Sequence, residues 1–323
     1  MPPPLLSLVV PFFNAETWLL PLLQSIDQQL TPEVQLVLVA DGPTDGSVAL
    51  VQGFMEHSEH RPCYLLLQQA NAGVSVARNQ GIRHAAGSYI GFVDADDLLL
   101  PGYIDQVLQA IRSEQPDLIE LGYKRFTDTK ALTQVKARYL HRSAGWLTKN
   151  KAVTEVFQLN QWFPWLRLYR KEIAMDFQFP EGIGFCEDVM AMPALYLAAE
   201  RLYHLRLPLY GYREHQASAS FNVKAEHQQQ LQNFFAKLQQ HQAYPALHPK
   251  WRQLLLLHLA YLLYKLQLDN KNQHNFPPQL ARQFRVLISQ CWWLPYFSVR
   301  KKIQLAFARY FFNKHRRCNP KQR

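Results

Sequence analysis

Cysteine is scarce in this 323-residue chain, and its spacing argues against two kinds of structural site. The four cysteines, Cys63, Cys186, Cys291 and Cys318, form no CxxC pair and recur at no fixed interval. Structural zinc sites and disulfide frameworks are recognised by such spacing. We therefore expect neither of them, and we expect a reducing compartment.

Long hydrophobic runs are also missing. The densest apolar stretch, Leu254 to Leu266, includes His258 and Lys265 and is shorter than the roughly 20 residues that cross a bilayer as a helix. The opening residues Met-Pro-Pro-Pro-Leu-Leu lack the basic region that begins a secretory signal. We therefore expect a cytoplasmic protein without a membrane span.

The phosphate-binding loops of two common enzyme classes are absent as well. The chain contains neither GxxxxGK[ST] nor GxGxxG. The first loop cradles the phosphates of P-loop ATPases, and the second holds the diphosphate of dinucleotide cofactors. ATPases and dinucleotide-dependent dehydrogenases are therefore disfavoured.

The chain does contain a large apolar fraction and an uneven distribution of charge. Hydrophobic residues make up 48% and aromatic residues 13%, which is enough for a packed core. Residues 223–323 contain 17 Lys and Arg but 2 Asp and Glu, whereas residues 1–222 contain 18 and 23. Because the last hundred residues are so basic, we expect them to meet an anionic partner.

Short apolar runs alternate with helical stretches through the first half. The runs at 5–10, 34–39, 64–67 and 89–93 predict strands, and the stretches 18–30, 47–56 and 74–86 predict helices. This alternation predicts an α/β fold with a mainly parallel sheet and helices on both faces. After residue 222 we expect Gln- and Leu-rich helices. Ligands of such sheets bind at the carboxyl ends of the strands.

Two of these predicted strands end in acidic segments. The segment from Asp41 to Ser47 is equally typical of a local turn with a helix N-cap. Asp94, Asp96 and Asp97 lie within four residues, and such carboxylates repel one another unless a cation or a donor-rich ligand lies among them. An oxygen-rich set predicts Mg²⁺ or Mn²⁺ with substrate phosphates as further ligands. A solvated acidic loop is the alternative.

Four blocks in the first 105 residues resemble the family 2 glycosyltransferases, which have the GT-A fold. The blocks are SLVVPFFNAE (7–16), VADGPTDGS (39–47), NAGVSVARNQG (71–81) and GSYIGFVDADD (87–97), in family order. Residues 164–170, 179–188 and 208–215 are similar to downstream family blocks. The resemblance thus implies a nucleotide-sugar-binding half (1–110), an acceptor-binding half (111–222) and a basic helical C-terminal region (223–323).

The resemblance implies roles for residues on the donor side. Pro11 and Asn14 would shape the floor of the pocket, and Asp41 would hydrogen-bond the base. Arg78 would lie near the base or the diphosphate. Ala40 and Pro43 depart from the family pattern beside Asp41, which puts the base preference in doubt.

The acids at 94–97 correspond to the DxD element of the family. The resemblance implies that Asp94 faces the ribose and that Asp96 binds the metal bridging the diphosphate, with Asp97 supporting. A carboxylate accepts ribose hydroxyls well, and a cation neutralises the charge that grows on a leaving diphosphate.

Glu187 and Asp188 match the acidic pair on the acceptor side of the family. The resemblance implies that Asp188 is the general base of an inverting transfer, which needs a carboxylate to remove the acceptor proton. The alternative for Asp188 is a helix N-terminal carboxylate, which the helix dipole favours. Both can hold together.

The residues after position 208 resemble a basic segment that closes over the diphosphate in this family. Arg213 would contact the donor there, and His215 would contact the metal or a phosphate. A surface histidine is the alternative for His215. Trp162 and Trp165 either stack on an acceptor sugar or fill the core.

The end of the chain predicts a basic amphipathic helix that begins near Ser298. Val299, Ile303, Phe307 and Tyr310 recur at helical spacing among nine basic residues from Arg300 onward. Such a helix is typical of binding to an anionic membrane surface. Nucleic acid is a disfavoured rival, and a solvated helix packed on the body is the other alternative.

Together with these features, the resemblance implies an inverting, metal-dependent transferase that adds a single sugar from a nucleotide donor, UDP-linked, to a cell-surface glycan or lipid-linked acceptor, such as lipopolysaccharide or capsule. We expect it at the inner membrane face. Processive relatives carry a QxxRW block after the acidic pair, whereas residues 158–162 precede that pair and lack the Arg. The alternatives are a sugar-phosphate nucleotidylyltransferase, whose N-terminal Gly-rich loop is absent, and a non-catalytic membrane- or nucleic-acid-binding module.

Overall fold

The computed structural model describes residues 3–174, 177–215, 225–269, 278–291, 302, 303 and 306. The chain divides into two compact units. One comprises Met1–Ala152 with Gln161–Asn222, and the other comprises Val153–Asn160 with Val223–Arg323. The division at residues 110 and 222 that the sequence implies stays a prediction.

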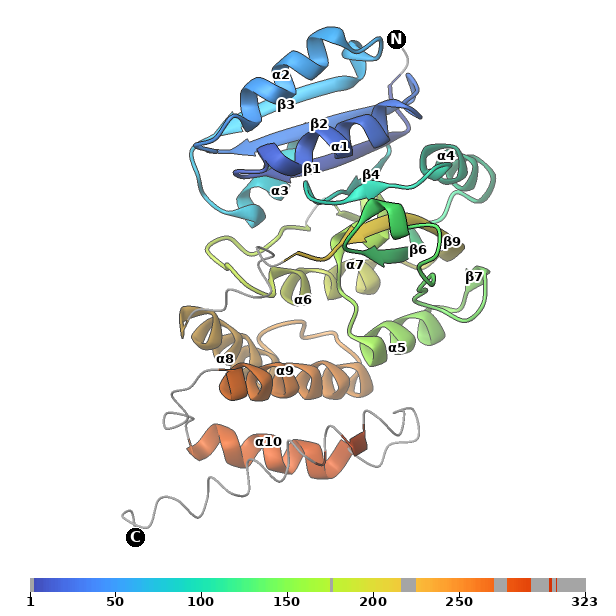
Figure 1. The fold of residues 1–323 in the computed structure, drawn as a ribbon. Coiled ribbons are helices and arrows are strands. Elements are labelled where there is room, and N and C mark those ends of the chain that lie inside the picture. Colours follow the sequence, from blue (N-terminus) through green and yellow to red (C-terminus); the bar gives the residue numbers. More distant parts are fainter. Residues whose placement is uncertain are drawn as a thin grey trace. The chain divides into compact units, whose positions relative to one another are not determined.

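The described part of the first unit is built around a nine-stranded sheet (Figure 1). The strands follow the order β3-β2-β1-β4-β8-β6-β9-β5, and β7 pairs with β9. Six strands (β1, β2, β3, β4, β6 and β9) run in one direction, and β5, β7 and β8 run opposite to them. The strands are β1 (Leu6–Phe12), β2 (Val34–Asp41), β3 (Tyr64–Gln69), β4 (Tyr89–Phe92), β5 (Leu98–Leu99), β6 (Leu118–Phe126), β7 (Gly145–Leu147), β8 (Arg167–Arg170) and β9 (Leu202–Arg213).

Helices follow the first parallel strands as the alternation of the sequence predicts. These are α1 (Glu16–Asp27), α2 (Ser47–His57) and α3 (Val74–His84). The later helices are α4 (Tyr103–Glu114), α5 (Lys149–Leu159), α6 (Glu187–Ala191) and α7 (Pro193–Ala198), of which α5 continues into the second unit from Val153 onward. Short 3₁₀ turns lie at Arg61–Cys63, Thr129–Ala131, Pro164–Leu166 and Lys171–Ala174. The predicted fold class, a mainly parallel sheet with flanking helices, is confirmed.

The two faces of β1 receive different helices because successive side chains of a strand point to opposite faces. Leu8 and Val10 belong to one buried cluster with Leu19 and Leu22 of α1. Val9 faces the other way and meets α3, where Gly81 comes so close that an added Cβ would lie 2.1 Å from a Val9 methyl carbon. Right-handed crossovers place α1 and α3 on opposite faces of the sheet, because the chain moves from β1 through β2 to β3 in one direction across the sheet and then moves back past β1 to β4 in the other direction.

The strand order reverses at β1, and this reversal positions the loops that carry the acidic segments. The chain leaves β1 toward β2, and β4 pairs with the opposite side of β1. Open α/β sheets bind their ligands at such a switch point, beyond the carboxyl ends of the strands. The ends of β6 and β9 open at the same edge of the sheet because both run parallel to β4.

The described part of the second unit is helical. Its helices α8 (Ala225–Gln239), α9 (Pro249–Asp269) and α10 (Pro278–Cys291) pack with α9 in contact with the other two. Arg252 of α9 is buried, and its guanidinium donates to the backbone oxygens of Leu238 and Tyr244. It thereby ties the last turn of α8, which contains Leu238, to the connection that leads to α9.

None of the described helices combines the length and apolar character needed to cross a bilayer. The basic helix predicted from residue 298 onward lies outside the described residues, apart from 302, 303 and 306. Its binding to an anionic membrane surface stays a prediction.

We predict that Gly81→Ala destabilises the protein by about 1–3 kcal/mol, because the added methyl overpacks the contact between α3 and β1. Gly53 of α2 is the matched control, since nothing lies within 4 Å of an added Cβ there. Gly53→Ala should instead stabilise the protein by about 0.5–1 kcal/mol through helix propensity. Urea unfolding measures both, and equal effects of the two substitutions would contradict the packing argument.

Candidate active site

The end of β2 holds Asp41 in a fixed orientation. Asp41 is 4% exposed. One carboxylate oxygen, Oδ1, accepts hydrogen bonds from Gln69 Nε2 and from the Ala72 N–H, both at 2.8 Å. The other, Oδ2, accepts from the Gly73 N–H at 2.9 Å. Three of about four acceptor positions of the carboxylate are thus used within the protein.

The loop after β1 lies against the loop after β2. Asn14 has a φ of 47°, and its side-chain oxygen accepts the Thr44 N–H at 2.7 Å. Pro11 is buried in β1. Gly42 has a φ of 62°, and a Cβ there would come within 2.5 Å of the Asn71 nitrogen, so the turn admits only glycine. The predicted donor residues of β1 and β2 therefore lie at one edge.

Arg78 of α3 connects this edge to the acidic pair of α6. Its guanidinium donates to Glu187 Oε1 at 2.7 Å and to Asp94 Oδ1 at 3.2 Å. The Arg78 side chain is 6% exposed and also lies over the ring of Phe179, 5.1 Å from its centre. Burial raises the pKa of Asp94, with Arg78 opposing and Asp96 adding to the rise. One guanidinium thus joins two acids that the sequence places far apart.

The acids after Asp94 are held by β9 and by the residues that follow it. His215 Nε2 and Asp96 Oδ2 are 2.7 Å apart, and both side chains are partly exposed. Arg213 donates through Nε to the Asp96 backbone oxygen at 2.7 Å. Asp97 is fully buried, and its two oxygens accept from the Arg213 N–H and the Tyr210 hydroxyl, each at 2.7 Å.

These contacts distinguish the two neighbouring acids. Burial first, and then the charges of Asp96 and Asp94, raise the pKa of Asp97 well above its ordinary value. The sequence predicts Asp97 as a metal ligand, but its contacts are those of a carboxylate that anchors β9 to the loop after β4. Asp96 and His215 are partly exposed, whereas Asp97 is buried.

The described residues contain no group of three or more His, Cys, Asp or Glu side chains arranged to hold a metal ion. Asp96 and His215 supply two donor atoms 2.7 Å apart. Mg²⁺ and Mn²⁺ are commonly bound through one or two protein ligands, with waters and substrate phosphates completing the shell. The pair therefore fits a metal that shares the phosphates of a donor, and it does not fit an all-protein cage.

Asp188 lies beside Glu187 at the start of α6. Its Oδ1 accepts the N–H of Val189 at 2.7 Å, and the side chain is partly buried. Burial, reinforced by the charge of Glu187, raises the pKa of Asp188 to about 7, while Arg78 opposes the rise. Cys186, with a φ of 60°, turns the chain directly before this pair. A carboxyl with this pKa can take up and release a proton near neutral pH.

Sequence reasoning missed two aromatic residues at this edge. The Tyr210 hydroxyl links the Asp94 N–H to Asp97. Trp18 of α1 stacks on His215 with ring centres 4.9 Å apart, and Arg213 lies over the Trp18 ring. Nothing in the sequence marks these aromatics, since such residues are equally common in cores. Trp162 and Trp165 are 1% and 2% exposed, which confirms that they fill the core.

The residues of this edge lie largely in a segment with known relatives. Residues 7–178 match the model of the family described as Glycosyl transferase family 2. The segment is more than half of the chain and includes Asp41, Arg78 and Asp94–Asp97. The chain belongs to glycosyl transferase family 2.

A family 2 relative is the uncharacterized glycosyltransferase EpsJ of Bacillus subtilis. The two are 30% identical over 220 residues, which are 65% of this chain and 61% of EpsJ. The chain thus spans less than two thirds of the length of EpsJ.

Solved structures share this fold. S. aureus TarS 1–349 in complex with UDP-GlcNAc has a TM-score of 0.69 at 18% identity, covering 96% of this chain and 89% of TarS 1–349. The mannosyltransferase PcManGT from Pyrobaculum calidifontis, in complex with GDP-Man and Mn²⁺, has a TM-score of 0.51 at 16% identity, covering 97% and 87%. The predicted GT-A fold is confirmed.

We predict that Asp188→Asn makes stability less dependent on pH. The folded state raises the pKa of Asp188 from 3.8 to about 7, so it binds this proton more tightly than the unfolded chain. The stabilisation is complete below about pH 3.8 and is lost as pH rises through about 7. Urea unfolding should therefore show the variant gaining stability relative to the parent protein between pH 4 and pH 8. A constant difference across this range would contradict the raised pKa.

Proposed function

We propose that this chain is an inverting, metal-dependent glycosyltransferase that moves one sugar from a nucleotide-sugar donor, UDP-linked, to a hydroxyl of a cell-surface glycan or lipid-linked acceptor. The proposal rests above all on Arg78, which joins Asp94 on the donor side to Glu187, the neighbour of Asp188. Family membership supports sugar transfer over nucleotidyl transfer and over a non-catalytic module. The UDP-GlcNAc complex of TarS supports the choice of donor.

The transfer exchanges one bond at the anomeric carbon for another. The acceptor oxygen forms a bond to that carbon while the bond to the diphosphate oxygen breaks, and attack from the opposite face inverts the configuration. The acceptor proton goes to Asp188, whose pKa of about 7 suits a base that works near neutral pH. Glu187 raises the pKa of this base and also pairs with Arg78.

The donor would lie along the edge that runs from Asp41 to Asp96. In this arrangement Asp41 meets the base and Asp94 accepts the ribose hydroxyls, while Asn14 and Pro11 form the floor. Asp96 and His215 would hold Mg²⁺ or Mn²⁺, as the Mn²⁺ in the PcManGT complex supports. The ion would neutralise the charge that grows on the leaving diphosphate. Arg213, stacked on Trp18, supplies further positive charge beside Asp96.

The location of the protein in the cell is part of the same proposal. The basic composition of residues 223–323 supports a peripheral position on an anionic membrane surface at the cytoplasmic face. A lipid-linked acceptor would be presented at that surface.

We predict that Asp188→Asn lowers the rate of sugar transfer by about 10²–10⁴-fold, because the amide cannot accept the acceptor proton. Donor affinity should stay nearly unchanged. Steady-state transfer and donor titration measure the two effects. Asp105→Asn, an exposed carboxylate of α4, is the matched control and should leave both unchanged. An Asp188→Asn protein with full activity would refute the assignment of the base.

We predict that Asp96→Ala weakens UDP binding in the presence of Mn²⁺ by about tenfold or more, because a charge-assisted contact is lost. Binding without metal should change far less. Calorimetric titration of UDP with and without Mn²⁺ separates the two, and Asp105→Asn again serves as control. An unchanged metal-dependent affinity in Asp96→Ala would reject the role of this residue.

A further inference from the structure

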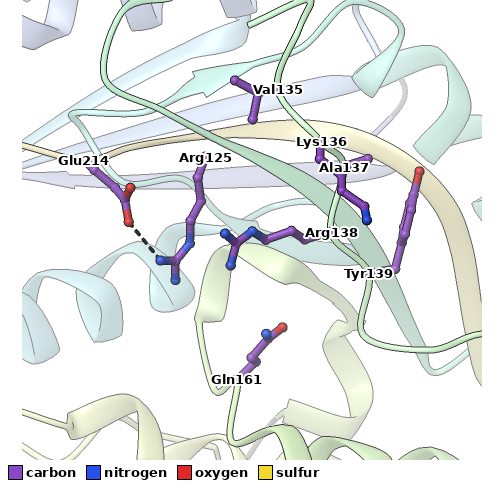
Figure 2. A pocket seen from close by; sticks show the side chains of 8 residues that line it. All are labelled: Arg125, Val135, Lys136, Ala137, Arg138, Tyr139, Gln161 and Glu214. Atoms are coloured by element: carbon purple, nitrogen blue, oxygen red, sulfur yellow. Dashed lines mark hydrogen bonds and ion pairs between the residues drawn. The ribbon is translucent and has the colours of Figure 1, made fainter.

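A pocket of about 560 Å³ lies beside the carboxyl ends of β6 and β9. None of the residues assigned above to the donor lines it. Figure 2 shows Arg125 and Arg138 extending into the same space above Gln161. The lining residues are Arg125, Val135, Lys136, Ala137, Arg138, Tyr139, Gln161 and Glu214.

The lining carries an excess of positive charge. Three cations, Arg125, Lys136 and Arg138, share the pocket with one carboxylate, Glu214, which pairs with Arg125 at 2.8 Å. Among the residues that the structure describes, neither Lys136 nor Arg138 has a carboxylate partner. Like charges in one pocket repel one another, and a bound anion would offset the excess.

Two polar atoms around the pocket also lack partners. Within the described residues, Arg125 Nε and the side-chain oxygen of Gln161 are buried and make no hydrogen bond. An unpaired buried donor or acceptor costs about 1–3 kcal/mol. A ligand that accepts from a guanidinium and donates a hydroxyl would satisfy both atoms, and a phosphorylated sugar or polyol has both groups.

The pocket adjoins the proposed donor site along β9. Glu214 lies between Arg213 and His215, the two residues whose side chains contact Asp96. Arg125 lies over the ring of Tyr212, which stacks on Trp165 with ring centres 5.2 Å apart. A substrate in this pocket would therefore lie next to the segment that holds Asp96.

We propose that this pocket binds a phosphate group of the acceptor, so that the acceptor is a phosphorylated sugar or polyol. The inference rests on the proposed transferase function and names its acceptor class. Phosphate fits better than carboxylate because it presents more acceptor oxygens, in a tetrahedral arrangement, to two guanidinium groups and an ammonium group. The shared chemistry is the phosphate, either in a phosphodiester between polyol units or in a diphosphate link to a lipid.

The test measures thermal stabilisation of the full chain saturated with UDP and Mn²⁺, so that the donor site is already filled. The probes are glycerophosphoglycerol as a phosphodiester, geranyl diphosphate as a lipid diphosphate, and glycerol and glucuronate as controls, all at constant ionic strength. Binding to the native state raises the melting temperature. We expect one or both phosphate probes to raise it in a concentration-dependent manner and the two controls to have no effect. The probe that acts identifies the source of the phosphate.

Arg138→Gln should weaken the binding of the probe that stabilises the parent protein by about tenfold or more, since hydrogen bonds to charged groups are strong. Arg138→Lys should retain part of the stabilisation by the probe, because lysine keeps the positive charge but lacks the planar guanidinium group. The matched control is Arg83→Gln, an exposed arginine of α3 outside the pocket, which should behave like the parent protein. Retained stabilisation by UDP shows that each variant is folded.

The outcomes separate this inference from the proposed function. If neither UDP nor a nucleotide sugar stabilises the parent protein, the proposed function fails. If UDP stabilises it but neither phosphate probe does, or if Arg138→Gln responds to the probe like the parent, the acceptor assignment is overturned and the transferase stands. The choice of phosphate is also overturned if glucuronate raises the melting temperature as much as the phosphate probes do and loses this effect in Arg138→Gln.

Discussion

A single buried guanidinium, that of Arg78, holds the two acidic parts of the site together. It lies on α3 and pairs with Glu187, 109 positions later in the chain, as well as with Asp94 after β4. A buried cation needs its partners, because removing one partner of a buried pair typically costs about 3–5 kcal/mol. The close packing of Gly81 on Val9 fixes the helix that carries this arginine. The packing of α3 on β1 therefore also determines where Arg78 meets Asp94 and Glu187.

The end of β9 supplies the second support. The Arg213 side chain turns toward Asp96, whereas the side chain of the adjacent Tyr212 turns toward Arg125 and the aromatic residues around Trp165. This alternation follows from the two-residue period of a strand. One short segment thus borders both the acidic edge and the cationic pocket, which relates the proposed donor and acceptor sides without any intervening domain.

Much of this arrangement could be predicted from local patterns. The apolar runs at 5–10 and 34–39 mark β1 and β2, because these parallel strands are buried on both faces and their sequences are almost continuously apolar. The acids at 41 and 94–97 were predictable because they directly follow such runs. The GT-A fold followed from the order of the motifs.

Long-range partners could not be predicted in the same way. No local sequence feature distinguishes Asp97, whose oxygens accept hydrogen bonds from β9, from Asp96, which is partly exposed and pairs with His215. The pairing of Arg78 with Glu187 depends on tertiary packing, and so does the pocket, whose lining comes from β6, the segment 135–139, Gln161 and Glu214. The distribution of charge along the chain does not indicate this pocket, since residues 1–222 are acidic on balance.

The depth of Arg78 has a consequence for how the two sides respond to dissolved ions. Mobile ions screen exposed charges over roughly 8 Å at physiological ionic strength but reach buried pairs much less. The Arg78 side chain is 6% exposed, whereas Lys136 and Arg138 are open to solvent. Added electrolyte therefore weakens the attraction of the pocket for anions while the link between α3, Asp94 and Glu187 persists.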